Sequence, residues 1–173
     1  MVTASKLNSD LRDNPTHNRE THGPLWIPTQ RWSKGNVFSD GAMLGSDPNS
    51  YMANLYLNSV NSYHHASELV PDDWISGGFV VKVHWTPADG TAGNVLFELT
   101  YLFVSAGENP RAAGATLAQN IAAGGSNIAE QIDTIGTTSA PTAGEWMRLV
   151  LNRNASDTYG AAANITGLEL EYV

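Results

Sequence analysis

In two stretches near the middle of the chain, large apolar side chains occupy every second position. They are residues 79–85 (FVVKVHW) and residues 95–103 (VLFELTYLF). This period of two places alternate side chains on opposite faces of a β-strand. The segment 88–93 (ADGTAG) between them is rich in turn-forming residues. The pattern predicts one long antiparallel hairpin whose inner face is rich in aromatic side chains.

Further strands are predicted on both sides of this pair. Residues 145–153 (EWMRLVLNR) and 165–173 (ITGLELEYV) also alternate, and residues 51–60 (YMANLYLNSV) are strand-like. Runs rich in Gly, Pro, Asp and Asn separate these stretches. Several short alternating strands without a helical pattern indicate one all-β domain, built as a β-sandwich or a barrel.

The middle of the chain has a weaker pattern. Residues 111–123 are rich in alanine, but Gly114 interrupts them and no apolar stripe with helical spacing develops. We therefore expect two outer strands, 115–121 and 128–135, connected at Gly124-Gly125. A short helix within 111–123 is the alternative.

The N-terminal residues differ from the rest. Residues 1–31 are polar, contain three prolines and follow no strand or helix period. Such a segment cannot bury enough apolar surface to offset its ordering entropy on its own. Residues 24–28 (PLWIP) nevertheless form an apolar patch, which we expect to dock on the domain or on a neighbouring subunit. The predicted organisation is an extended N-terminal arm over residues 1–34 and a β-domain over residues 35–173.

The net charge of −8 is unevenly distributed. Residues 1–34 carry five basic and three acidic side chains (+2), whereas residues 35–173 carry four basic and fourteen acidic ones (−10). An acidic body repels nucleic acid and anionic membranes, so neither is expected as a partner. The basic arm could lie on an acidic protein surface, or it could be a solvated tail. Charged residues are only 15% of the chain, against roughly 25% in ordinary soluble domains, which is common where neighbouring chains cover the surface.

Cysteine is absent, so neither disulfides nor cysteine-based zinc sites are expected. Residues 1–14 contain no apolar core of a secretion signal. No stretch approaches the roughly eighteen apolar residues of a membrane span. We therefore expect a soluble chain that is made in a cytoplasm.

The nearest approach to a metal or acid/base cluster is His64-His65 followed by Glu68. Adjacent residues of a strand point to opposite faces, so the two imidazoles could not share a metal there without a bulge. A pairing of His65 with Glu68 is possible if the segment is a loop. A structural or interface role is the favoured interpretation.

Other candidates for chemistry are fewer still. Asp72-Asp73 suits a turn before the next strand, since an acid/base pair needs two different environments. His84 is expected on the outward face of its strand, beside Lys82. No serine-nucleophile, zinc-protease or phosphate-loop motif occurs. We expect no enzymatic activity, no cofactor and no metal.

Five tryptophans raise the question of sugar binding, because exposed aromatic rings stack on the faces of sugar rings. Trp85 belongs to the predicted inner stripe, Trp74 to a corner, and Trp26 and Trp32 to the arm or its docking segment. Trp146 is ambiguous. A carbohydrate platform usually needs two or three exposed aromatic residues on one face, and the pattern alone does not assemble one.

The order of turns and aromatic residues is distinctive in two parts of the domain. The first part contains ELVPDDW (68–74), a Gly-Gly step, a strand ending in VHW (83–85), and GNVLFELTY (93–101). The second part contains AGEWMRLVLNR (143–153) and ITGLELEY (165–172). This order resembles small virion proteins of tailed bacteriophages that adopt jelly-roll-like β-sandwiches.

The resemblance implies an all-β, antiparallel, jelly-roll-like β-sandwich with a structural role in a virion assembled in the host cytoplasm. The expected function is that of a homotrimeric capsid decoration (cement) protein that binds the major capsid protein or another virion protein. The alternative is a receptor- or glycan-binding module of a phage tail or head fibre. Deleting residues 1–30 is expected to leave a folded domain that no longer binds shells. The candidate partner-binding residues are Leu25, Trp26, Ile27, Arg12, Arg19 and Arg31.

Overall fold

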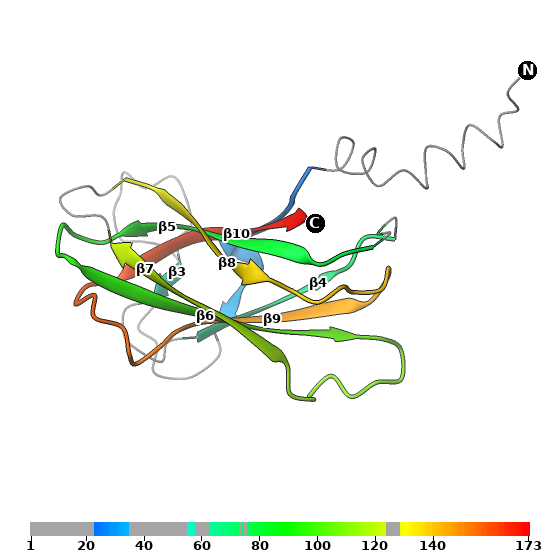
Figure 1. The fold of residues 1–173 in the computed structure, drawn as a ribbon. Coiled ribbons are helices and arrows are strands. Elements are labelled where there is room, and N and C mark those ends of the chain that lie inside the picture. Colours follow the sequence, from blue (N-terminus) through cyan, green and yellow to red (C-terminus); the bar gives the residue numbers. More distant parts are fainter. Residues whose placement is uncertain (1–22, 35–54, 58–62, 73, 75, 124–128) are drawn as a thin grey trace, which may run out of the picture.

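The computed structural model describes residues 23–34, 55–57, 63–72, 74, 76–123 and 129–173. In these residues the chain forms strands and connecting loops, with one three-residue 3-10 turn (Figure 1). None of the helical structure in these ranges is long and apolar enough to cross a membrane. The elements in chain order are β1 (Leu25–Pro28), η1 (Thr29–Arg31), β2 (Ser33–Lys34), β3 (Leu55–Leu57), β4 (Tyr63–Leu69), β5 (Phe79–Pro87), β6 (Gly93–Val104), β7 (Ala115–Ala123), β8 (Gln131–Thr137), β9 (Trp146–Arg153) and β10 (Ala163–Tyr172).

The strands form two antiparallel sheets that pack face to face as a sandwich (Figure 1). Sheet A has the order β1-β10-β5-β8, and β3 also pairs with β10. Sheet B has the order β2-β4-β9-β6-β7. The sequence-based prediction of an all-β, antiparallel β-sandwich is therefore confirmed.

The predicted hairpin between β5 and β6 is wrong. β5 pairs with β10 and β8 in sheet A, whereas β6 pairs with β9 and β7 in sheet B. Their apolar faces instead meet across the sandwich, where the rings of Trp85 and Phe97 lie 5.3 Å apart, edge to face. Alternation identifies the inner face of a strand, but a strand with one apolar face can lie beside its neighbour or opposite it.

The two weaker strands lie at the edges of the sheets. β7 is the outer strand of sheet B and β8 the outer strand of sheet A, as predicted, and the helical alternative within 111–123 is wrong. Most β7 side chains are exposed, which explains why its pattern is weak. The predicted connection at Gly124-Gly125 lies outside the described residues. Of the predicted strand 51–60, only residues 55–57, which form β3, are described.

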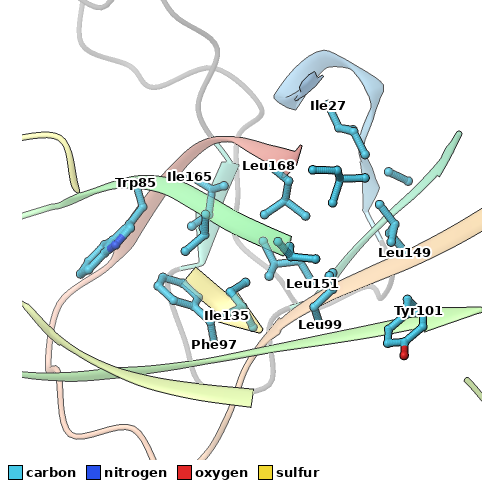
Figure 2. Close-up of a cluster of buried hydrophobic side chains, with 14 of the residues drawn as sticks. Ile27, Trp85, Phe97, Leu99, Tyr101, Ile135, Leu149, Leu151, Ile165 and Leu168 are labelled. Atoms are coloured by element: carbon cyan, nitrogen blue, oxygen red, sulfur yellow. The ribbon is translucent and has the colours of Figure 1, made fainter. Parts of the chain in front are cut away.

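The core is built from the inner faces of both sheets (Figure 2). The apolar positions of β5, β6, β9 and β10 predicted from alternation are buried, except Phe103 and Tyr172, which are partly buried and pack against the core. Trp74 is also buried, and its ring packs on Phe79 and Tyr172 at 4.6 and 5.1 Å, as expected for a corner anchor. The largest fully buried side chains are Trp32, Trp85, Phe79, Phe97, Ile27, Leu99, Met147, Leu149, Leu151 and Ile165.

Residues 25–34, which we call the strap, belong to both sheets. β1 pairs with β10 in sheet A, η1 crosses the edge of the sandwich, and β2 pairs with β4 in sheet B. Ile27 has no exposed surface and lies near Leu168 and Leu149 (Figure 2). The buried Trp32 indole donates a hydrogen bond to the Ile27 carbonyl at 3.5 Å. The apolar patch of the predicted arm therefore docks on the chain's own sandwich.

The loop after β9 is held by a buried ion pair. Arg153 Nε and Nη2 donate to Asp157 Oδ2 and Oδ1 at 2.7 and 2.9 Å, and both side chains are buried. The guanidinium also donates to the carbonyls of Ala161 and Tyr159. Asp157 in turn accepts from the Leu96 and Tyr159 backbone amides at 3.1 and 2.7 Å. The loop is thereby fastened to β6 through charge-assisted hydrogen bonds.

Candidate functional site

The outer face of sheet A carries polar and aromatic side chains in one register. Trp26 of β1 lies opposite Glu169 of β10, which lies opposite Lys82 of β5, which lies opposite Thr134 of β8. Glu169 and Lys82 point outward because the residues on either side of each are buried. With neighbouring strands about 4.8 Å apart, this row extends about 14 Å across the sheet.

Trp26 is the exposed aromatic side chain of this row, with 40% of its surface accessible. Its indole lies over Gly167, where an added Cβ would come within 2.5 Å of the ring. Its ring also packs edge to face against His84, with centroids 4.8 Å apart. Glycine at 167 and the histidine edge together hold the indole in one orientation. Because Trp26 is fixed before any ligand arrives, little side-chain entropy would be lost on binding.

Acidic and basic side chains alternate beside this ring in what we call the charged chain: Glu171, Lys82, Glu169, His84 and Glu130. Lys82 Nζ donates to Glu171 Oε2 at 2.8 Å and to Glu169 Oε1 at 3.0 Å. His84 Nε2 lies 3.0 Å from Glu169 Oε2, and its Nδ1 lies 3.6 Å from Glu130 Oε1. The charged chain thus links β10, β5 and the residue before β8.

The ion pairs shift two titrating groups of the charged chain. The pKa of Lys82 is raised, first by its hydrogen bond to Glu171 and then by that to Glu169. Burial acts to raise the pKa of Glu169, but its hydrogen bonds with Lys82 and His84 outweigh burial, so that pKa lies below its usual value. Both groups are therefore charged at neutral pH.

Taken together, this face offers a flat apolar ring beside closely spaced hydrogen-bonding groups. Ile132, 56% exposed, lies opposite His84 in the register, so an apolar side chain flanks the histidine on the β8 side and Trp26 on the β1 side. Carboxylates, an ammonium and an imidazole between them can both donate and accept. Such a surface suits a ligand with an apolar face and a polar, hydroxyl-rich edge.

The predicted partner-binding residues are dispersed by the structure. Trp26 enters the site just described, Leu25 is half-buried and Ile27 lies in the core, where no partner can reach it. Arg31 forms an ion pair with Glu68 of β4, and that hydrogen bond raises the pKa of the guanidinium. Arg12 and Arg19 lie outside the described residues.

The histidine pair is divided between the two faces of β4. His64 points inward and is buried, whereas His65 is half-buried on the outer face, as the strand geometry predicts. Burial first, and then the charge of Arg148, lower the pKa of His65. Glu68 faces inward and is held by Arg31, so the alternative pairing of His65 with Glu68 is wrong. Among the described residues no group of three or more side chains could hold a metal ion.

Trp146 lies on the opposite side of the molecule from Trp26. It is 58% exposed on the outer face of sheet B, between Leu69 and Val104 in the register. Its neighbours there in the register are apolar. Arg148, two residues along β9 on the same face, donates hydrogen bonds to the carbonyls of Pro110 and Ala112. Among the residues that the structure describes, Trp146 therefore has fewer hydrogen-bonding side chains beside it than Trp26 has.

Comparison with known sequences finds no matching family model and no matching curated protein. Comparison with solved structures does find similar folds. The CBM36-1 domain of a multidomain xylanase from the hindgut metagenome of Trinervitermes trinervoides matches with a TM-score of 0.52 and 14% identity, over 87% of this chain and 98% of that domain. The Agl-KA catalytic domain matches with a TM-score of 0.52 and 16% identity, over 88% of this chain and 28% of that one. At these identities the likeness establishes the β-sandwich fold.

Proposed function

We propose that this chain is a carbohydrate-binding module that holds a glycan against the outer face of sheet A. The observation that carries the proposal is the fixed, exposed Trp26 ring beside the charged chain. A sugar ring has an apolar face of C–H groups, which can stack on an indole, and a rim of hydroxyls. Those hydroxyls can form charge-assisted hydrogen bonds with carboxylates and an ammonium.

The fold comparison supports the same function. A carbohydrate-binding domain of a xylanase shares this fold over nearly its whole length. The glycan-binding alternative given in the sequence analysis is therefore better supported than capsid decoration. Trp26 and the charged chain do not by themselves favour binding to a capsid. A place on a phage fibre stays a prediction from the resemblance.

We propose binding without turnover. A glycosidase needs a carboxyl group whose pKa is raised, so that it can donate a proton to the leaving oxygen. The pKa of Glu169, the central carboxylate of this face, is lowered, which does not suit Glu169 to the role of that proton donor. Its hydrogen bonds with Lys82 and His84 suit a group that accepts hydrogen bonds from hydroxyls.

A glycan array probed with the full chain, followed by calorimetric titration of the sugars that bind, tests this function. Trp26→Ala should weaken binding about 30-fold or more, because a buried aromatic contact is worth about 2 kcal/mol or more. Trp146→Ala is the matched control, since it removes an equally large exposed ring from the other sheet, and its affinity should stay within twofold of the wild type. Absence of binding on the array, or equal losses in both variants, would refute the proposal.

Self-association as a homotrimer is a separate proposal, taken from the resemblance and from the low proportion of charged residues. Mass photometry of the purified full chain should then give a species of three times the 18.5 kDa chain mass. A monomer across the accessible concentration range would refute the trimer and would leave the glycan-binding proposal in place.

A further inference from the structure

We infer that Glu171 is a specificity-determining residue that makes this face bind neutral sugars and reject acidic ones. The inference rests on the proposed glycan-binding function and adds to it the class of ligand. It follows from the way in which the basic groups of the face are already engaged by carboxylates.

Lys82 is the ammonium to which an acidic sugar would bind. Its Nζ lies between Glu171 Oε2 at 2.8 Å and Glu169 Oε1 at 3.0 Å. Two of its three N–H donors are therefore used within the protein, and its positive charge is balanced by these carboxylates. β5 and β10 contribute one other basic side chain to this face, His84. That imidazole is similarly placed between Glu169 and Glu130.

The charged chain consequently has an excess of negative charge. Three carboxylates face one ammonium and one imidazole, which gives −2 with the imidazole neutral and −1 with it protonated. The other side chains of residues 35–173 add to the repulsion, because the net charge of −10 of this region leaves −8 once the −2 of the charged chain, with its imidazole neutral, is taken out. A uronic acid bound beside Trp26 would bring another carboxylate into this field, whereas a neutral hexose would donate its hydroxyls to it.

Glu171 can be changed with little effect on the rest of the face. Its side chain is 53% exposed and contacts Lys82, whereas Glu169 is 19% exposed and also contacts His84. Replacing Glu171 with glutamine keeps the shape of the side chain but removes one negative charge. Lys82 stays charged, because Glu169 still contacts it, and it is then available to an incoming carboxylate.

The experiment titrates the full chain with two matched pairs of tetrasaccharides. The pairs are β-1,4-linked glucose with β-1,4-linked glucuronate, and β-1,4-linked mannose with β-1,4-linked mannuronate. Wild type should prefer the neutral member of a pair that binds. Glu171→Gln should raise the ratio of uronate affinity to neutral-sugar affinity about fivefold, as expected for a unit charge at about 4 Å in water. In about 1 M salt the difference should largely vanish.

Two further variants show whether the effect is local. Glu108→Gln removes the same charge from an exposed turn after β6 and should leave both affinities unchanged. Adding Lys82→Met to Glu171→Gln should abolish the gain for uronates, because the freed ammonium is its source.

Three results would overturn the inference. Equal affinity of the wild type for neutral and acidic members refutes the role of Glu171 but leaves glycan binding intact. An equal gain in Glu108→Gln assigns the effect to net charge. Absence of binding to every sugar, on the array and in both pairs, refutes the inference and the proposed function together.

Discussion

Replacing Asp157 with alanine should lower the free energy of unfolding by about 3–5 kcal/mol, the usual cost of removing one partner from a buried ion pair. The substitution leaves the Arg153 guanidinium buried without its carboxylate. It also removes the acceptor for the Leu96 amide and one of two acceptors for the Tyr159 amide, which still donates to the Asn94 carbonyl. Chemical denaturation monitored by tryptophan fluorescence gives the difference directly.

The matched control for this prediction is Glu108→Ala. Glu108 is also an acidic side chain that accepts a backbone hydrogen bond, from Ser105, but its surroundings are exposed. It should cost less than about 1 kcal/mol. Hydrogen exchange at the Leu96 amide adds a local readout, because Asp157→Ala should expose that group. An Asp157→Ala protein as stable as the Glu108→Ala protein would show that the ion pair does not hold the loop.

Deleting residues 1–30 should destabilise the sandwich by at least about 3 kcal/mol and should abolish cooperative unfolding if the remaining stability is small. This reverses the expectation drawn from the sequence, because the deletion removes β1 and Ile27 from the core. Ile27→Ala alone should cost about 2–5 kcal/mol. Deleting only residues 1–22, which keeps β1 and Ile27, is the matched control.

Calorimetric melting of the three proteins separates the possible outcomes. If the chain without residues 1–30 melts at the temperature of the full chain, β1 is not part of the cooperative unit. The glycan-binding proposal adds a second readout, because the same deletion removes Trp26. Loss of sugar affinity from a protein that remains folded would then place Trp26 in the site without a change of fold.

The fold class followed from the sequence because alternation reports which face of a strand is buried. The stripes ending at Trp85 and at Phe103 were assigned to their correct inner faces for this reason. Their pairing was not, because strand partners are chosen by packing over long separations and not by local pattern. The strap was underestimated for a related reason. β1 has only four residues, and of its consecutive apolar residues Leu25, Trp26 and Ile27 only Ile27 is fully buried, so no period of two develops.

The candidate site is assembled by strand pairing, which the alternation of apolar and polar residues does not reveal. Lys82 and His84 were placed correctly on the outward face of β5, but Glu169 becomes their partner only through the pairing of β5 with β10. Trp26 joins them because β1 pairs with the other edge of β10. The sequence signal that could have revealed the site is the matched charge pattern of the two strands, with Lys82 opposite Glu169.

The central place of β10 also has a consequence for the order in which the protein is made. β10 pairs with β1, β3 and β5, and Leu25 of β1 lies opposite Leu170. Sheet A can therefore be completed only after β10, residues 163–172, has been translated, although β5 can pair with β8 before that. Pairings between distant segments fold slowly and leave strand edges unpaired in the meantime. Until β10 emerges from the exit tunnel, the edges of β1, β3 and β5 with which it pairs are therefore left open.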